Sequence, residues 1–233
     1  MLGDLAAPKK EALDFQGRPR LAKGKVSAKQ HVPPEIAKPP YADSGFLPDM
    51  NERIQTHNEE QIAKMRKAGR LAAEVLDFAE SIAKPGVTTD YIDQKVHKMI
   101  IEHGAYPSPL NYGGFPKSVC TSLNECICHG IPDDTVLMDG DIVNIDVTVF
   151  LDGHHGDTSR TVLVGNVSDE VRALCKATDV RIAFPKSRHL RLPPLPDCFT
   201  SMAVVERKCT TGNSFQYSTR GSYKYITSAL FYL

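Results

Sequence analysis

Two aspartates, Asp146 and Asp157, have the spacing that places two carboxylates side by side on a β-sheet. Residues 141–158 predict two strands joined by a tight turn at residues 152–153, an Asp-Gly dipeptide that type I′ hairpin turns favour. A two-residue turn would pair Thr148 with Asp157, so that Asp146 and Asp157 are diagonal neighbours on one face. Two carboxylates this close repel each other unless a proton or a cation lies between them.

This acidic pair allows three interpretations. Carboxylate oxygens bind hard or borderline divalent cations, and two bridging carboxylates can hold two such ions close together. Alternatively, the two groups could share one proton, as in aspartic proteases and glycosidases. In the third interpretation one aspartate belongs to a turn and the other forms an ion pair with Arg160. The metal site is the most specific of these hypotheses, and the spacing of the two aspartates leaves the other two open.

Histidines and cysteines near the hairpin are further candidates. His129 lies between two predicted strands, where it could bind a metal or donate to a substrate oxygen, although a loop histidine often does neither. Cys126 and Cys128 precede it, but a structural zinc site needs a second pair of ligands at a matching interval. Cysteines that alternate on a strand are commonly small core residues. A Cys/His nucleophile pair is the remaining alternative.

Helices and strands that would position these residues follow from the hydrophobic periodicity. Asn58 and Gln61 resemble a capping box that opens a helix, which Lys-Pro-Gly at 84–86 ends. Thr88 or Thr89 caps a second helix that ends before Gly104. A loop rich in Pro and Gly is expected at 106–115 and a Cys-rich strand at 118–128. The hairpin runs on to residue 164, and a third helix begins near residue 170.

Composition divides the 233 residues into three parts. Residues 1–54 hold seven of the sixteen prolines and predict an extended arm, which is a linker or drapes over a partner surface. Residues 55–179 form the folded part, and residues 180–233 predict a poorly folded tail. Residues 51–180 contain twelve basic and twenty acidic side chains, which suits a cation site and argues against a nucleic-acid partner.

Cellular location is less sharply indicated. An apolar run of membrane-spanning length is absent from the sequence, so no membrane partner is expected. Scattered cysteines favour a reducing intracellular compartment. Acidic residues among the first fifteen make this stretch a poor organellar transit peptide.

Three segments resemble the type I methionine aminopeptidases. They are YPSPLNYGGFPKSVCTSLNECICHGIP at 106–132, GDIVNID at 140–146 and HGDTSR at 155–160, within a resemblance that covers about residues 55–178. The proline- and lysine-rich arm is similar to that of plant organellar members. The resemblance implies an α+β pita-bread fold, of which the N-terminal half is recognisable here. It also implies removal of the initiator methionine from nascent proteins whose second residue is small.

The resemblance also assigns roles to residues. It implies two divalent metal ions (Co, Mn, Fe or Zn), with Asp146 and Asp157 as ligands and His129 in catalytic contact with the substrate near the scissile bond. The implied partners are the N-terminal methionine of nascent chains and the ribosome, and the implied compartment is the chloroplast or mitochondrion, with the cytoplasm as the alternative. The positions that match the methionine pocket are Pro109, Tyr112, Phe115 and Cys120.

The second half of the family pattern is missing. The family takes one His and two Glu ligands from that half, whereas only Glu170, His189 and Glu206 follow Asp157 here, in unrelated contexts. A truncated or alternatively spliced product, or a reading-frame change near residue 179, is the expected cause. We therefore expect little or no aminopeptidase activity from this chain. The alternative is a non-catalytic pita-bread relative that binds peptides or ribosomes. Xaa-Pro peptidases share the aspartate pair but lack the 106–132 segment.

Overall fold

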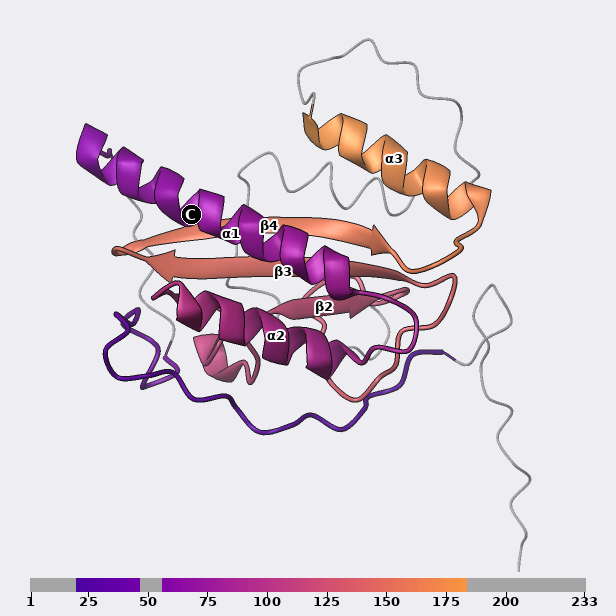
Figure 1. Ribbon diagram of the computed structural model, residues 1–233, viewed down its shortest axis with the longest axis horizontal. Helices are drawn as coiled ribbons and strands as arrows, with labels where there is room; N and C mark the ends of the chain where they lie inside the picture. Colours follow the sequence, from indigo (N-terminus) through magenta and orange to yellow (C-terminus); the bar gives the residue numbers. More distant parts are fainter. Residues whose placement is uncertain (1–19, 47–55, 184–233) are drawn as a thin grey trace, which may run out of the picture. The chain divides into compact units, whose positions relative to one another are not determined.

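The computed structural model describes residues 20–46 and 56–183 (Figure 1). Contacts divide the chain into two units after Gly165, and α3 belongs to the second unit. Most of the tail predicted from residue 180 lies outside the described residues, as do 1–19 and 47–55, so the boundaries at 54 and 179 stay predictions. The elements are α1 (Glu59–Ile82), α2 (Thr89–Glu102), β1 (Tyr106–Pro107), η1 (Tyr112–Gly114), β2 (Cys120–Leu123), β3 (Ile142–Leu151), β4 (His154–Leu163) and α3 (Asp169–Ala183).

Helix α1 begins at the predicted capping box. The Asn58 side chain accepts from the Gln61 N–H at 2.9 Å, and the Gln61 side chain accepts from the Asn58 N–H at 2.9 Å. The helix ends at Ile82, and Ala83 caps it before the Lys-Pro-Gly stop. One face of α1 is buried and forms part of the main core: Ala68, Leu71, Ala72, Val75, Leu76 and Ala79.

Helix α2 also has the predicted ends. The Thr88 hydroxyl accepts from the Tyr91 N–H at 3.1 Å and so caps the first turn. The helix ends at Glu102, and Gly104 then takes a φ of 70°, a left-handed conformation that glycine adopts without strain. Among the described helices none is both long and apolar enough to cross a membrane.

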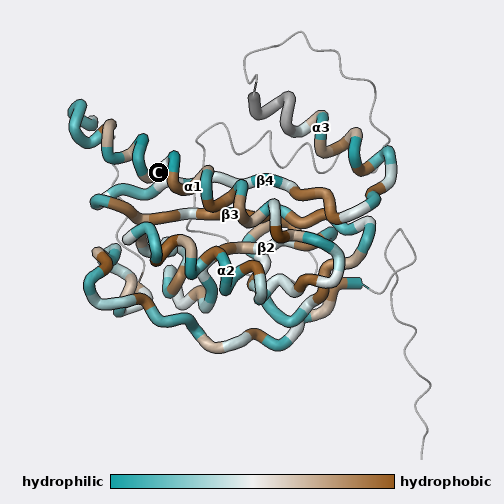
Figure 2. Tube along the Cα trace, viewed as in Figure 1, coloured by the Kyte–Doolittle hydropathy of each residue, from teal (hydrophilic) through white to brown (hydrophobic). Residues whose placement is uncertain are grey.

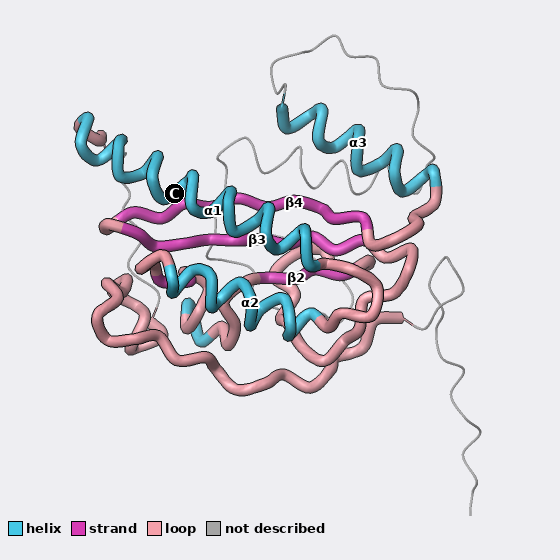
Figure 3. The backbone as a smooth tube through the Cα atoms, in the orientation of Figure 1, coloured by secondary structure: helices cyan, strands magenta, loops and turns pink. Residues whose placement is uncertain are grey.

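Strand β3 is the centre of the antiparallel sheet. β4 pairs with β3 along its whole length, so β1 and β2 share the opposite edge of β3 (Figure 3). Leu151 lies opposite His154 and Thr148 opposite Asp157, which confirms the predicted register. Residues 152 and 153 have φ values of 52° and 85°, as a type I′ turn requires.

The two faces of the sheet differ sharply. Val143, Ile145, Val147 and Val149 are fully buried on the face that α1 covers. A Cβ at Gly156 would lie 2.3 Å from the backbone of α1, so helix and strand approach each other at backbone distance there. The opposite face of β3 carries alternating polar side chains, although β3 as a whole is mainly hydrophobic (Figure 2). This second face holds the acidic pair.

Two predicted segments differ from the structure. The loop expected at 106–115 contains the short strand β1 and the 3-10 turn η1. The Cys-rich strand expected at 118–128 stops at Leu123, because Asn124 takes a φ of 46° and its side chain bonds both Asp141 and the N–H of Ile142. The pairing of β2 with β3 thus ends at Leu123, and Cys126 and Cys128 lie in the irregular segment that follows and not on a strand.

Residues 20–46 pack against this chain's own folded part. They follow α2 in the same direction (Figure 1), with Ser27 bonded to Asp90 at 2.7 Å and Gln30 bonded to Asp93 at 2.9 Å. Further along they add apolar side chains to a second, smaller core. The buried members of that core are Val32, Ile36, Tyr41, Tyr106 and Leu110.

Candidate metal site

Asp146 and Asp157 lie on the same face of the hairpin, as the register requires. Burial, followed by the charge of Asp157 and a hydrogen bond between the two carboxyl groups, raises the pKa of Asp146 to about 7. The Thr148 hydroxyl donates to Asp157 Oδ1 at 2.7 Å and fixes its orientation. The two carboxyl groups are close enough to share a proton or to bind one cation between them.

Arg160 takes no part in this pair. Its guanidinium donates to Asp77 at 2.8 Å and also pairs with Glu80, and both of these residues belong to α1. Both members of the acidic pair lie within strands and not in turns. The interpretation in which one aspartate belongs to a turn and the other pairs with Arg160 is therefore wrong.

Cys120 and His129 both lie near the acidic pair. Cys120 is the direct neighbour of Asp146 across the ladder, and burial, together with the charge of Asp146, raises the pKa of its thiol. This side chain therefore stays a neutral thiol. Burial lowers the pKa of His129, and the nearby charge of Asp157 opposes that shift. A neutral imidazole is the form that binds a metal or accepts a proton.

The backbone beside His129 is held tightly against β2. Gly130 accepts from the Thr121 N–H at 2.9 Å and donates to the Ser122 hydroxyl at 3.1 Å. A Cβ at Gly130 would lie 2.2 Å from the Thr121 carbonyl oxygen. Glycine is thus required at this contact, and His129 itself takes a φ of 53°. These constraints fix the backbone at residues 129 and 130 beside β2, and the His129 side chain is near enough to Asp157 to feel its charge.

Three of the residues matched to the methionine pocket lie in one closed loop. The Tyr112 N–H donates to the Pro109 carbonyl at 3.0 Å, and the Asn111 N–H donates to the Phe115 carbonyl at 2.7 Å. Asn111 has a φ of 62°, which lets the loop close within a few residues. The fourth, Cys120, lies on β2.

His155 also contacts this part of the fold, although the sequence alone assigned it no role. Its ring Nδ1 is 2.9 Å from the Ser108 hydroxyl, and it shares a sheet face with Asp157. Burial lowers the pKa of His155, and the charge of Asp157 opposes that shift. The two-residue alternation of β4 was the signal that places residues 155 and 157 on one face.

The structure also contains a buried ion cluster around Lys117 that the sequence did not predict. Lys117 is 1% exposed, and its ammonium group contacts Asp90, lies 3.7 Å from Asp93 and donates to Ser27 at 2.6 Å. The Ser118 N–H also donates to Asp93 at 2.6 Å. The cluster therefore joins three parts of the chain, namely α2, residues 20–46 and the segment that leads into β2.

The donor set fits half of a divalent-metal site. Paired carboxylate oxygens suit Mn²⁺, Fe²⁺, Co²⁺ or Zn²⁺, and the pKa of Asp146 is raised by burial first and by the charge of Asp157 second, a charge that a cation between the two groups would offset. Within residues 20–46 and 56–183, however, no group of three or more His, Cys, Asp and Glu side chains is arranged to hold a metal ion.

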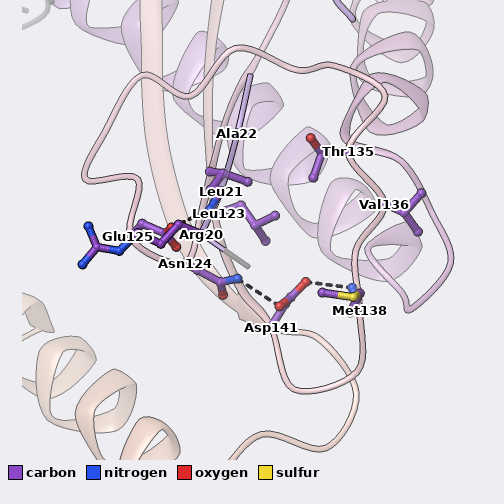
Figure 4. A pocket seen from close by; sticks show the side chains of 10 residues that line it. All are labelled: Arg20, Leu21, Ala22, Leu123, Asn124, Glu125, Thr135, Val136, Met138 and Asp141. Carbon is purple, nitrogen blue, oxygen red and sulfur yellow. Dashed lines mark hydrogen bonds between the residues drawn. The ribbon is translucent and has the colours of Figure 1, made fainter. Parts of the chain in front are cut away.

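A shallow pocket of about 170 Å³ lies elsewhere (Figure 4). It is lined in part by Leu21, Val136 and Met138, and by Asn124 and Asp141, which are joined by a hydrogen bond. Neither member of the acidic pair lines it. The chemistry of the hairpin is therefore separate from this pocket.

Comparison with known proteins decides the family. A sequence model of metallopeptidase family M24 matches residues 63–180. The chain belongs to metallopeptidase family M24. Similar M24 relatives are methionine aminopeptidase 1B, chloroplastic, of Arabidopsis thaliana (59% identity over 161 residues, 69% of this chain and 44% of the relative) and methionine aminopeptidase 1D, mitochondrial, of Homo sapiens (55% identity over 144 residues, 62% and 43%). The chain thus spans less than half the length of these relatives.

Solved structures of methionine aminopeptidases also match this chain. Methionine aminopeptidase from Rickettsia prowazekii matches with a TM-score of 0.55 and 52% identity, covering 56% of this chain and 53% of that one. The Thermotoga maritima enzyme matches with a TM-score of 0.54 and 30% identity, covering 60% and 56%. The predicted α+β pita-bread fold, present here in about half of its extent, is confirmed. The predicted resemblance to type I methionine aminopeptidases is confirmed as well.

Proposed function

We propose that this M24 domain serves the metal-dependent removal of N-terminal methionine from nascent polypeptides whose second residue is small. The similarity to methionine aminopeptidases supports this substrate, and the acidic pair supports the metal. Asp146 and Asp157 would hold the divalent ions. When bound, such ions polarise the scissile carbonyl and lower the pKa of water.

The residues of this chain would divide the remaining work. Thr148 orients the Asp157 carboxylate through its 2.7 Å hydrogen bond. His129, with the nearby Asp157 charge, would contact the substrate beside the scissile bond. The loop that contains Pro109, Tyr112 and Phe115, together with the neutral thiol of Cys120, would surround the apolar methionine side chain.

The described part of the chain supplies two carboxylate ligands and so half of a dinuclear site. Two carboxylates alone bind divalent ions weakly, and the further ligands and proton acceptor of a complete site are not among the matched motifs. We therefore expect weak metal binding and little or no cleavage by these 233 residues. Binding without cleavage is also the behaviour of the alternative, a non-catalytic protein that binds peptides or ribosomes.

The acidic pair, on which the proposal depends, can be tested by isothermal titration calorimetry with Mn²⁺. The unaltered chain is expected to bind Mn²⁺, and Asp146→Asn and Asp157→Asn are each expected to abolish that binding. Asp152→Asn is the matched control, because Asp152 is an exposed turn residue paired with Lys67 at 2.7 Å. Equal Mn²⁺ affinity in all four proteins would refute the site. Cleavage of Met-Ala-Ser with added Co²⁺ or Mn²⁺ would refute the expected inactivity.

We propose an organellar compartment, the chloroplast or mitochondrion, and a position near the ribosome where nascent chains emerge. The names of the plant and human relatives support the compartment. Imaging of the full chain with a C-terminal fluorescent tag tests the compartment, and co-sedimentation with ribosomes tests the partner. A purely cytoplasmic signal would contradict the first proposal, and absence from the ribosomal fraction would contradict the second.

A further inference from the structure

Tyr41, on residues 20–46, reaches into the part of the fold that carries the candidate site. Its side chain is 4% exposed, and its hydroxyl donates to the carbonyl oxygen of Ser108 at 2.8 Å. Its ring meets the Tyr112 ring edge-on, with 4.8 Å between centroids. This segment follows α2 to its C-terminal end before it turns back (Figure 1). Tyr41 therefore contacts the backbone of one loop residue and the side chain of another.

Ser108 connects Tyr41 to the acidic pair. The Ser108 N–H donates to the Thr148 carbonyl at 2.9 Å, and its hydroxyl is 2.9 Å from His155 Nδ1. The Thr148 hydroxyl in turn donates to Asp157 Oδ1 at 2.7 Å. A continuous path of hydrogen bonds and short backbone links thus runs from the Tyr41 hydroxyl to the Asp157 carboxylate.

Aromatic packing adds a second connection. The His155 ring lies nearly parallel to the Tyr41 ring, at 6.4 Å between centroids, and lies 4.8 Å from the Phe150 ring. His155 and Phe150 are direct partners across the β3–β4 ladder. The orientation of the imidazole is therefore set by the Ser108 hydroxyl at Nδ1 and by two neighbouring aromatic rings, one nearly parallel to it and one tilted by 50°.

We propose that Tyr41 is a positioning residue for the candidate site, holding Ser108, and through it His155 and Asp157, in place. The proposal rests on the proposed function, because it gives residues 20–46 a role in the same site. Residues 20–46 then help to position the acidic pair, and are more than a flexible linker to the domain. The hydrogen-bond path makes a specific prediction. Removal of the Tyr41 hydroxyl should change the environment of His155 even though the Tyr41 ring stays in place.

The test compares three variants of the full chain. Tyr41→Phe removes only the hydroxyl, and Ser108→Ala removes the hydroxyl that faces His155. Tyr91→Phe is the control, since Tyr91 is 42% exposed on α2. ¹⁵N NMR of the His155 side chain reads the hydrogen bond at Nδ1 without any metal. We expect a clear shift in Ser108→Ala, a smaller shift of the same sign in Tyr41→Phe, and none in the control.

Mn²⁺ affinity provides the second measurement. Loss of a partner that orients a metal ligand commonly weakens metal binding by about tenfold to a hundredfold, so a more remote group such as Tyr41 should weaken it by about threefold to tenfold. A residue that only fills space would lower the unfolding temperature but leave both the His155 signals and the affinity unchanged. That result in Tyr41→Phe would overturn the proposal. Failure of the unaltered chain to bind Mn²⁺ would overturn the proposed function, while the His155 signals would still decide the role of Tyr41.

Discussion

Replacing Lys117 by Met is expected to be among the most damaging single changes in the described fold. The new side chain keeps a similar length but loses the charge that lies between Asp90 and Asp93. Burial would by itself raise the pKa of Asp90, but hydrogen bonds from Lys117, Ser27 and Gln94 bring it below its ordinary value. Burial raises the pKa of Asp93, and its contacts with Ser118, Lys117 and Gln30 offset that rise only in part. Without Lys117 both carboxylates lack their cation.

The size of the loss follows from burial. Removal of one partner from a buried ion pair costs about 3–5 kcal/mol of unfolding free energy. Asp93 would keep two of its donors, the Ser118 N–H at 2.6 Å and Gln30 at 2.9 Å, so we expect about 3 kcal/mol, at the lower end of that range. Since whole domains are stable by about 5–15 kcal/mol, the variant should be visibly less stable but still folded.

The pH dependence of this loss has a definite sign. Without the lysine charge the pKa of Asp93 should rise further, and a carboxyl whose pKa is raised in the folded state stabilises the fold only while protonated. Its contribution is present below the pKa of the unfolded chain and is lost as the pH rises through the pKa of the folded protein. The deficit of the Lys117→Met variant should therefore be largest near neutral pH and should shrink as the pH falls toward about 4.

Urea unfolding followed by far-UV circular dichroism measures the deficit, since the chain has no tryptophan to report by fluorescence. Lys67→Met is the matched control: its ammonium lies 2.7 Å from Asp152, but both side chains are about half exposed, so its loss should cost less than about 1 kcal/mol. A loss of unfolding free energy in Lys117→Met no larger than that of the control would refute this account of the cluster. A loss that is equal near neutral pH and near about pH 4 would refute it too.

Three further outcomes are expected. Gly156→Ala should lower the unfolding free energy, measured in urea, by about 1–3 kcal/mol, because its Cβ would overlap the backbone of α1. Gly69→Ala should instead raise the unfolding free energy by about 0.5–1 kcal/mol, because its Cβ meets nothing within 4 Å. Burial lowers the pKa of His97 in the folded protein. The contribution of this residue to stability should therefore be fully present above the pKa of a histidine in the unfolded chain, about 6.5, and should decline as the pH falls below that value. A urea midpoint that stays constant between about pH 7.5 and 5.5 would contradict this. Asp157→Asn should lower the pKa of Asp146 from about 7 toward its ordinary value, and an unchanged carboxyl titration by ¹³C NMR would count against coupling of the pair.

Features set by neighbouring residues could be predicted from the sequence. The Asp-Gly turn and the two-residue alternation around it determine the register of β3 and β4, and the register alone brings Asp146 and Asp157 to one face. The caps of α1 and α2 are local too, since each requires a side chain and an N–H only three residues apart. Such features need no knowledge of the rest of the fold.

Features that depend on distant segments could not be predicted. Ser27 and Lys117 are 90 residues apart in the chain, and no periodicity indicates that they touch. The early end of β2 depends on bonds from Asn124 to residues 17 and 18 positions away. The one available signal for the ion cluster was the lysine itself, the single charged residue between Phe115 and Cys120. In the absence of a structure, that lysine reads as an ordinary surface charge.

The tight turn between β3 and β4 also bears on how the site is assembled during folding. Asp146 and Asp157 are separated by a hairpin closed by two residues, so bringing them together costs little chain entropy. Hairpins of this kind form within about 1–10 μs, although they persist only when another element covers them. Helix α1 precedes the hairpin in the chain and is synthesised first, so its apolar face is available when the strands meet. The acidic pair is therefore expected to form from contacts local in sequence, whereas residues 20–46 join the fold through partners 63–109 residues away.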